Sequence, residues 1–184
     1  MTQRLTQIDP AAATGKVKEI FDATMAKIKM IPNVYRVFAN SPKVLEGYMA
    51  FNTAMAGVSL PAGLREQLAI AIAETNGCGY CLSAHTAIGK MVGVSAEDLN
   101  AAQSGNASDT KTAAALQFAR KVSSERGHVS DADLAAVKAA GYSDAEIVEI
   151  VALTSLNILT NYVNNVAATE IDFPVTSFNT KKAA

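Results

Sequence analysis

Apolar residues recur along most of this chain at the three- and four-residue spacing of an amphipathic helix. Near the N-terminus one such face is formed by Val17, Ile20, Phe21, Met25 and Ile28. Runs of alternating β-branched residues, which would favour strands, are almost absent, as are Asn-Gly turns between such runs. The pattern therefore predicts an all-α fold.

Pro or Ser at helix starts and Gly at helix ends divide the chain into predicted helices. We expect them at residues 11–30, 33–42, 43–58, 59–75, 78–92, 95–103, 109–127, 131–141 and 144–170. Residues 104–108 are typical of a linker. No pattern follows Asp172, so the tail is expected to lie on the surface or to cross a partner subunit.

With 184 residues, of which 49% are hydrophobic, the chain is long enough to bury a core. We expect one domain, residues 1–184, with N-terminal helices (1–60), a central segment (61–93), C-terminal helices (94–171) and a tail (172–184). Lys and Arg number 16 against 17 Asp and Glu. Because no basic stripe stands out, nucleic acid is not an expected partner.

Targeting and membrane signals are not evident in the sequence. The first twenty residues contain no apolar core typical of a secretory signal. The apolar stretch LAIAIA at residues 68–73 is far shorter than a membrane span. We therefore expect a soluble, cytoplasmic protein with no membrane partner.

Two segments of the chain resemble each other. Glu66 precedes Cys78 by twelve residues, and Glu149 precedes Asn161 by twelve, where NYVN stands in place of CGYC. This is consistent with a duplicated helical unit whose second copy lacks the thiols. Chance similarity between two Ala-rich helices is the alternative.

The stretch ETNGCGYCLSAHT (74–86) holds both cysteines of the chain, Cys78 and Cys81, with His85 four residues later. Asn76-Gly77 should end one helix and start the next, so that both thiols lie near a helix N-terminus. There the helix dipole and unpaired amides favour thiolate over thiol. His85 lies on the same helix face as both cysteines and could bond a thiolate or carry its proton.

The preceding helix carries carboxylates on one face. Glu66 and Glu74 are eight residues apart, and either could orient His85 if the two helices fold back on each other. For Glu66 the alternative is a surface pair with Arg65. Glu74 is expected to be a solvated helix residue and is the weaker candidate.

Other uses of two cysteines fit less well. The two cysteines could simply be buried apolar side chains. They could also bind zinc together with His85 and a Glu, but structural zinc sites usually have a second pair of ligands, and none is present. His128 is expected in an exposed loop, remote from the cysteines. The haem motif CxxCH fails because Leu82 follows the second cysteine. In thioredoxin the CxxC motif lies beside β-strands, and no strand pattern flanks the motif here. We expect no metal and no bound cofactor.

The segment LREQLAIAIAETNGCGYCLSAHT resembles the signature of the alkylhydroperoxidase AhpD-like branch of the carboxymuconolactone decarboxylase family. The similarity is strongest over residues 61–93, and IPNVYRVFANSPKVLEGY resembles the segment that this branch carries ahead of it. The resemblance implies an all-helical AhpD-like fold and a homo-oligomer, a trimer or hexamer.

The resemblance also implies roles for individual residues. Cys81 would attack the peroxide, Cys78 would resolve the product to a disulfide, and His85 with Glu66 would relay protons. Tyr80 stands where the founding enzyme has a second histidine, and its hydroxyl could donate a hydrogen bond instead. The substrate would be an alkyl hydroperoxide or hydrogen peroxide, with an external dithiol as reductant.

Three other functions fit the same residues. They are a thiol-disulfide oxidoreductase or redox sensor without peroxidase activity, an enzyme like the decarboxylases, and a non-catalytic helical oligomer with structural or metal-bound thiols. The helix at residues 43–57 carries Tyr48, Met49, Phe51 and Met55, which could wall an apolar pocket. Ordinary core or subunit interface is the favoured alternative for these four.

Overall fold

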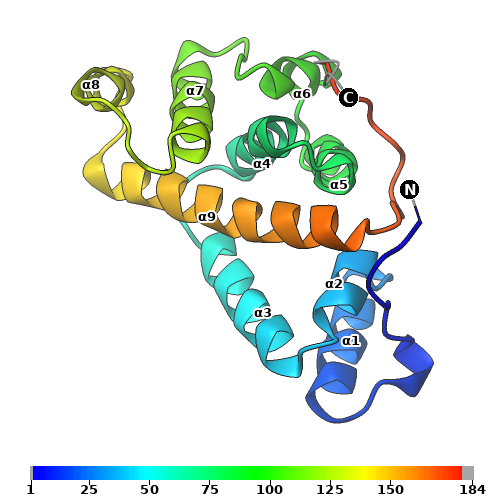
Figure 1. Ribbon diagram of the computed structural model, residues 1–184. Helices are drawn as coiled ribbons and strands as arrows, with labels where there is room; N and C mark the ends of the chain where they lie inside the picture. Colours follow the sequence, from blue (N-terminus) through cyan, green and yellow to red (C-terminus); the bar gives the residue numbers. More distant parts are fainter. Residues whose placement is uncertain (1, 180–184) are drawn as a thin grey trace.

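The computed structural model describes residues 2–179, and every regular element in that range is a helix (Figure 1). The elements are η1 (Pro10–Ala12), α1 (Gly15–Ile28), α2 (Asn33–Phe38), α3 (Pro42–Ala56), α4 (Ala62–Asn76), α5 (Gly79–Met91), α6 (Ala96–Gln103), α7 (Thr110–Ser124), α8 (Asp131–Ala139) and α9 (Asp144–Ala167). The predicted all-α fold is confirmed.

Helix α9 crosses the middle of the molecule, with α4 to α7 on one side and α1 to α3 on the other (Figure 1). Residues 150–169 of the chain contain no charged side chain. Within the described range α9 is the one helix long and apolar enough to span a membrane by length and composition. Those are also the properties of a core helix, and α2, α3, α4, α5 and α7 all pack against it.

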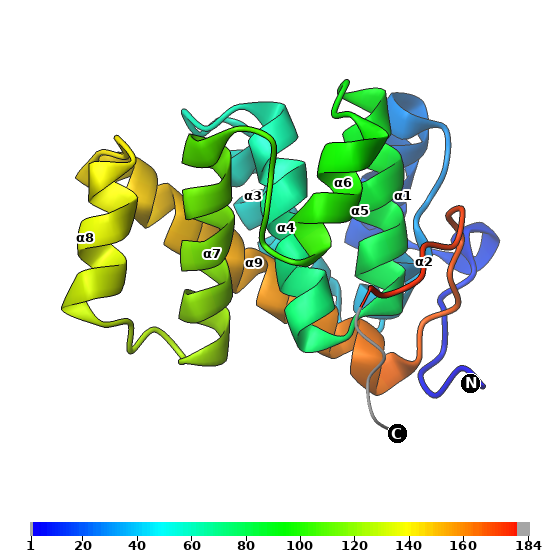
Figure 2. The same ribbon diagram turned by 90° about the horizontal axis from the view of Figure 1, so that it is seen from above.

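The middle of helix α4 is buried on all sides. Every residue from 67 to 74 is buried, because α5, α6, α7 and α9 all contact this helix. Figure 2 shows α4 between α7 and α5. Because other helices pack against α4 on several sides, the side chains on α4 are held in fixed positions.

Helix boundaries follow the predicted caps in most places. The side chains of Ser95, Ser130 and Ser143 each accept a hydrogen bond from a backbone N–H in the first turn of the helix that follows. Ser41 is at an N-cap but makes no such bond. The predicted helix at residues 11–30 begins late: a 3₁₀ turn comes first, and α1 starts at Gly15, where φ is +53°.

The predicted break after Asn76 is present. Gly77 ends α4 with φ of +62°, a left-handed conformation that favours glycine. Cys78 is then the N-cap of α5, and its sulfur accepts a hydrogen bond from the backbone N–H of Cys81 at 3.2 Å. Helix α9 has no matching break at Asn161. The two similar segments thus differ in structure, and their duplication stays a prediction.

The tail up to residue 179 lies on the surface of its own chain. The Thr176 N–H donates to the Ser83 hydroxyl on α5 at 3.1 Å, and the Asn179 N–H donates to the Gln103 side chain on α6 at 2.9 Å. Phe173 and Phe178 pack partly buried against the core. Residues 180–184 of the predicted tail lie outside the described residues.

Replacing Gly77 with Ala should destabilise the fold by about 1 kcal/mol, because a Cβ disfavours the left-handed conformation. Gly47→Ala is the matched control, since Gly47 lies on an exposed face of α3 and an added Cβ would meet nothing within 4 Å. This control should gain roughly 0.5 to 1 kcal/mol from helix propensity. Urea unfolding measures both. Equal effects of the two substitutions would contradict the proposed role of the turn.

Candidate active site

Cys78 and Cys81 form a disulfide at the start of α5, with their Cα atoms 5.4 Å apart. Cys78 is fully buried, whereas Cys81 is 3% exposed and lines a pocket that Cys78 does not reach. The two sulfurs therefore differ in access. A small molecule in this pocket would meet the sulfur of Cys81.

The pocket has a volume of about 280 Å³ and is lined by residues of α2, α3, α4, α5, α9 and the tail. Its apolar walls include Val34, Tyr35, Tyr48, Met55, Leu156 and Phe173. Tyr48 and Met55 thus line a pocket, although ordinary core or subunit interface was the favoured expectation for the helix at 43–57. Met49 packs against the core, and Phe51 is not among the lining residues. Asn52, Asn157 and Thr160 add uncharged polar groups.

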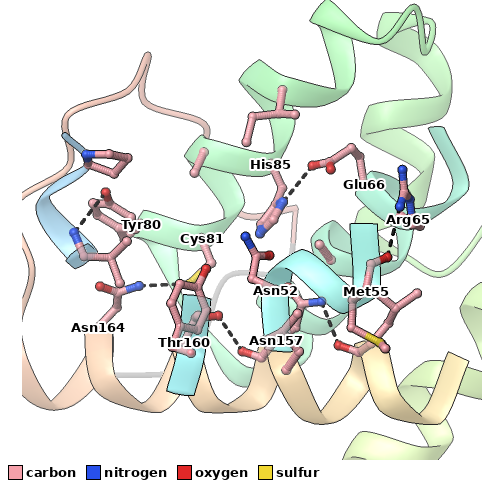
Figure 3. Close-up of a pocket in the computed structure, with 18 of the residues that line it drawn as sticks. Asn52, Met55, Arg65, Glu66, Tyr80, Cys81, His85, Asn157, Thr160 and Asn164 are labelled. Atoms are coloured by element: carbon pink, nitrogen blue, oxygen red, sulfur yellow. Dashed lines mark hydrogen bonds and ion pairs between the residues drawn. The ribbon is translucent and has the colours of Figure 1, made fainter. Parts of the chain in front are cut away.

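His85 and Glu66 form a close pair across α5 and α4. The His85 Nδ1 and Glu66 Oε2 are 2.7 Å apart, and the two side chains are 25% and 19% exposed (Figure 3). A carboxylate at Nδ1 holds a proton there, which leaves Nε2 free to accept one. Arg65 donates instead to the backbone carbonyls of Met55 and Ala56. The alternative of an Arg65–Glu66 surface pair is therefore not formed.

Asn164 on α9 contacts the sulfur of Cys81. Its Nδ2 lies 3.3 Å from Cys81 Sγ, while among the described residues neither sulfur is hydrogen-bonded to His85 (Figure 3). Sequence reasoning missed Asn164, which lies 83 residues from Cys81. A faint signal was the series Asn157, Asn161, Asn164 and Asn165 in a stretch of the chain, residues 150–169, that contains no charged side chain.

The Tyr80 hydroxyl is engaged away from His85. It accepts a hydrogen bond from the Val34 N–H at 3.3 Å, and its ring meets Phe173 edge to face at 5.7 Å. Burial, reinforced by the Asp172 carboxylate, raises the Tyr80 pKa far above its usual value of about 10. Tyr80 thereby joins α5 to α2 and to the tail. Its role in proton transfer stays a prediction.

Glu74 is buried, with 4% of its surface exposed, so the expectation of a solvated helix residue is wrong. The reason is that α4 packs against neighbours on several sides. Glu74 does not line the pocket. Of the two carboxylates considered, Glu66 is the one beside His85.

The described residues contain no set of side chains that would support the metal-binding alternative. Across residues 2–179, no three His, Cys, Asp or Glu side chains are grouped so that they could hold an ion. The two sulfurs are bonded to each other. His128 is exposed, as expected.

Residues 42–125 match the model of the carboxymuconolactone decarboxylase family. The fold matches the alkylhydroperoxidase AhpD core structure of an uncharacterized peroxidase-related protein from Ralstonia eutropha JMP134, with 24% identity, a TM-score of 0.84 and 92% of both chains covered. The fold is therefore AhpD-like. The predicted resemblance is confirmed.

Two further solved structures share this AhpD-like fold. A peroxidase-related protein from Silicibacter sp. TM1040 is 23% identical, with a TM-score of 0.79 over 92% of this chain and 94% of that one. The debrominase Bmp8, as a cysteine-to-alanine variant bound to 2,3,4-tribromopyrrole, is 20% identical, with a TM-score of 0.80 over 94% of this chain and 93% of that one. Comparison with curated protein sequences found no match.

Tyr80→Phe should make stability less sensitive to alkaline pH. Above about pH 10 the unfolded chain ionises Tyr80, whereas the folded protein keeps it protonated because its pKa is raised. This contribution is complete below pH 10 and is lost as the pH rises further. At pH 11 the wild type should have lost about 1.4 kcal/mol more than the variant, relative to pH 9. Identical losses in urea unfolding would contradict the burial argument.

Proposed function

We propose that this protein is a CxxC-dependent hydroperoxide reductase. The observation that carries the proposal is the asymmetry of the disulfide: Cys81 faces a pocket and Cys78 does not. The pocket also holds a His85–Glu66 pair able to move protons. Together these supply a nucleophile, a resolving thiol and an acid-base group.

In the reduced protein, Cys81 reacts as a thiolate. Its place in the first turn of α5 stabilises the negative charge through the helix dipole. His85 accepts the thiol proton at Nε2 while Glu66 holds its Nδ1 proton. Because His85 and Cys81 are not directly bonded in the disulfide form, a water or the substrate's own oxygen carries the proton between them.

The thiolate then attacks the terminal oxygen of the hydroperoxide. The S–O bond forms as the O–O bond breaks, and sulfur is oxidised while the peroxide is reduced to an alkoxide. The protonated His85 gives its proton to this alkoxide, which leaves as an alcohol. The product on the protein is the sulfenic acid of Cys81.

Cys78 completes the cycle. Its thiol attacks the sulfenic acid, a disulfide forms and water leaves. The short Cα separation of 5.4 Å lets this happen without unfolding the start of α5. An external dithiol then restores both thiols by exchange, entering through the pocket at the sulfur of Cys81.

Decarboxylation of a carboxylated lactone suits the pocket less well. Such a substrate is an anion and calls for a cation to hold it. The basic residues that line the pocket are His85, paired with Glu66, and Arg65, which donates to two backbone carbonyls. The uncharged Asn and aromatic walls instead suit a neutral, largely apolar substrate.

Reductive removal of a halogen is a second candidate, which the aromatic lining favours. Tyr35, Tyr48 and Phe173 could enclose a flat ring beside Cys81, and the similar debrominase Bmp8 is seen with a tribrominated pyrrole. This reaction uses the same two electrons as the reduction of a hydroperoxide. A carbon–bromine bond is replaced by a carbon–hydrogen bond, bromide leaves, and the two thiols become a disulfide.

Cysteine substitutions test the proposal directly. Wild type should oxidise a dithiol in the presence of tert-butyl hydroperoxide, and Cys81→Ser should lose this activity entirely. Cys78→Ser should stop after one turnover with a sulfenic acid at Cys81, detected with dimedone by mass spectrometry. Full turnover by Cys81→Ser would refute the assignment. Activity toward 2,3,4-tribromopyrrole but not peroxides would select the second candidate.

Glu66→Gln should lower the rate of Cys81 with peroxide roughly 100-fold or more, since His85 loses the carboxylate that sets its proton. Glu19→Gln is the matched control, because Glu19 pairs with Lys16 on the exposed face of α1. That control should keep the wild-type rate. An unchanged rate in Glu66→Gln would remove the proton relay from the mechanism.

A further inference from the structure

The amide of Asn164 occupies an unusual position at the end of α9. Its Nδ2 donates to Cys81 Sγ at 3.3 Å, and the residue is 3% exposed and lines the pocket. Its Oδ1 is buried and has no hydrogen-bond partner among residues 2–179. One amide thus places a donor on the reactive sulfur and an unused acceptor beside it.

We propose that Asn164 is a catalytic residue with two tasks. Its N–H stabilises the Cys81 thiolate. Its Oδ1 accepts the hydrogen bond of the hydroperoxide O–H and so places the oxygen to be attacked next to sulfur. The first task depends only on the geometry at Cys81, whereas the second rests on the proposed peroxide function.

The donor task follows from the change of charge at sulfur. A disulfide sulfur is a weak hydrogen-bond acceptor, whereas a thiolate carries a full negative charge and accepts strongly. The contact between Asn164 and Cys81 therefore strengthens when the protein is reduced. Because an amide is neutral in both states, this stabilisation does not depend on the protonation state of His85.

The acceptor task follows from the unpartnered oxygen. A buried amide oxygen without a hydrogen bond is costly, and native structures rarely leave one. The O–H of a bound hydroperoxide supplies the missing donor. After the O–O bond breaks, the same O–H belongs to the sulfenic acid of Cys81 and keeps its bond to Oδ1, so the amide serves both states.

If Asn164 had a purely structural role, it would act through its backbone at the end of α9. There its carbonyl accepts hydrogen bonds from the backbone N–H groups of Ala168 and Thr169. Side-chain substitution leaves these bonds in place. The decisive measurement is therefore chemical: the Cys81 thiol pKa in a Cys78→Ser background, where Cys81 is the sole thiol. Thiolate absorbance at 240 nm against pH reports it.

Asn164→Ala should raise the Cys81 thiol pKa by about one unit, from the loss of one hydrogen bond to a charged group. Asn164→Asp, which nearly keeps the side-chain shape, should raise it further because a carboxylate repels the thiolate. Asn165→Ala, at an exposed neighbouring position whose amide contacts the Asn76 carbonyl, should leave it unchanged. An unchanged thiol pKa in Asn164→Ala and Asn164→Asp overturns the donor task.

The acceptor task is tested by kinetics with tert-butyl hydroperoxide in proteins that keep Cys78. Each protein is assayed well above its own Cys81 pKa, so that thiolate content is equal. There Asn164→Ala should still lose about tenfold in kcat/KM. Equal values overturn the acceptor task. No peroxide turnover by wild type would overturn the proposed function and this task together, whereas the pKa measurement decides the donor task by itself.

Discussion

The left-handed turn at Gly77 is the constraint on which the rest of the site depends. It ends α4 and makes Cys78 the N-cap of α5, so the two helices fold back on each other. That hairpin brings Glu66, near the start of α4, within 2.7 Å of His85 on α5. This one turn thus places Cys78 and Cys81 at a helix N-terminus and also brings the Glu66 carboxylate to the His85 imidazole.

Helix α9 completes what the hairpin begins. Because it packs against both α4 and α5, its C-terminal half lines the pocket and brings Asn164 to the sulfur of Cys81. The tail that follows α9 adds Phe173 to the lining, against Tyr80. The site therefore combines a local hairpin with groups that only long-range packing can supply.

This division explains how much could be predicted from sequence. Local signals, namely helical spacing and Asn76-Gly77, predicted the all-α fold and placed both cysteines near a helix N-terminus with His85 on the same face. The family resemblance, not a local signal, selected Glu66 over Glu74 as the carboxylate for His85. Asn164 could not be predicted, since nothing local joins it to Cys81. Glu74 was misjudged because a carboxylate was expected to face water, whereas α4 is enclosed by other helices.

The central claim is a two-electron transfer from the cysteine pair to a molecule in the pocket. It is tested most directly by mixing fully reduced protein, without external reductant, with one equivalent of tert-butyl hydroperoxide. The account predicts loss of two thiols per peroxide, one alcohol released, and a Cys78–Cys81 disulfide identified by mass spectrometry. Peroxide left unconsumed while both thiols stay reduced would contradict it.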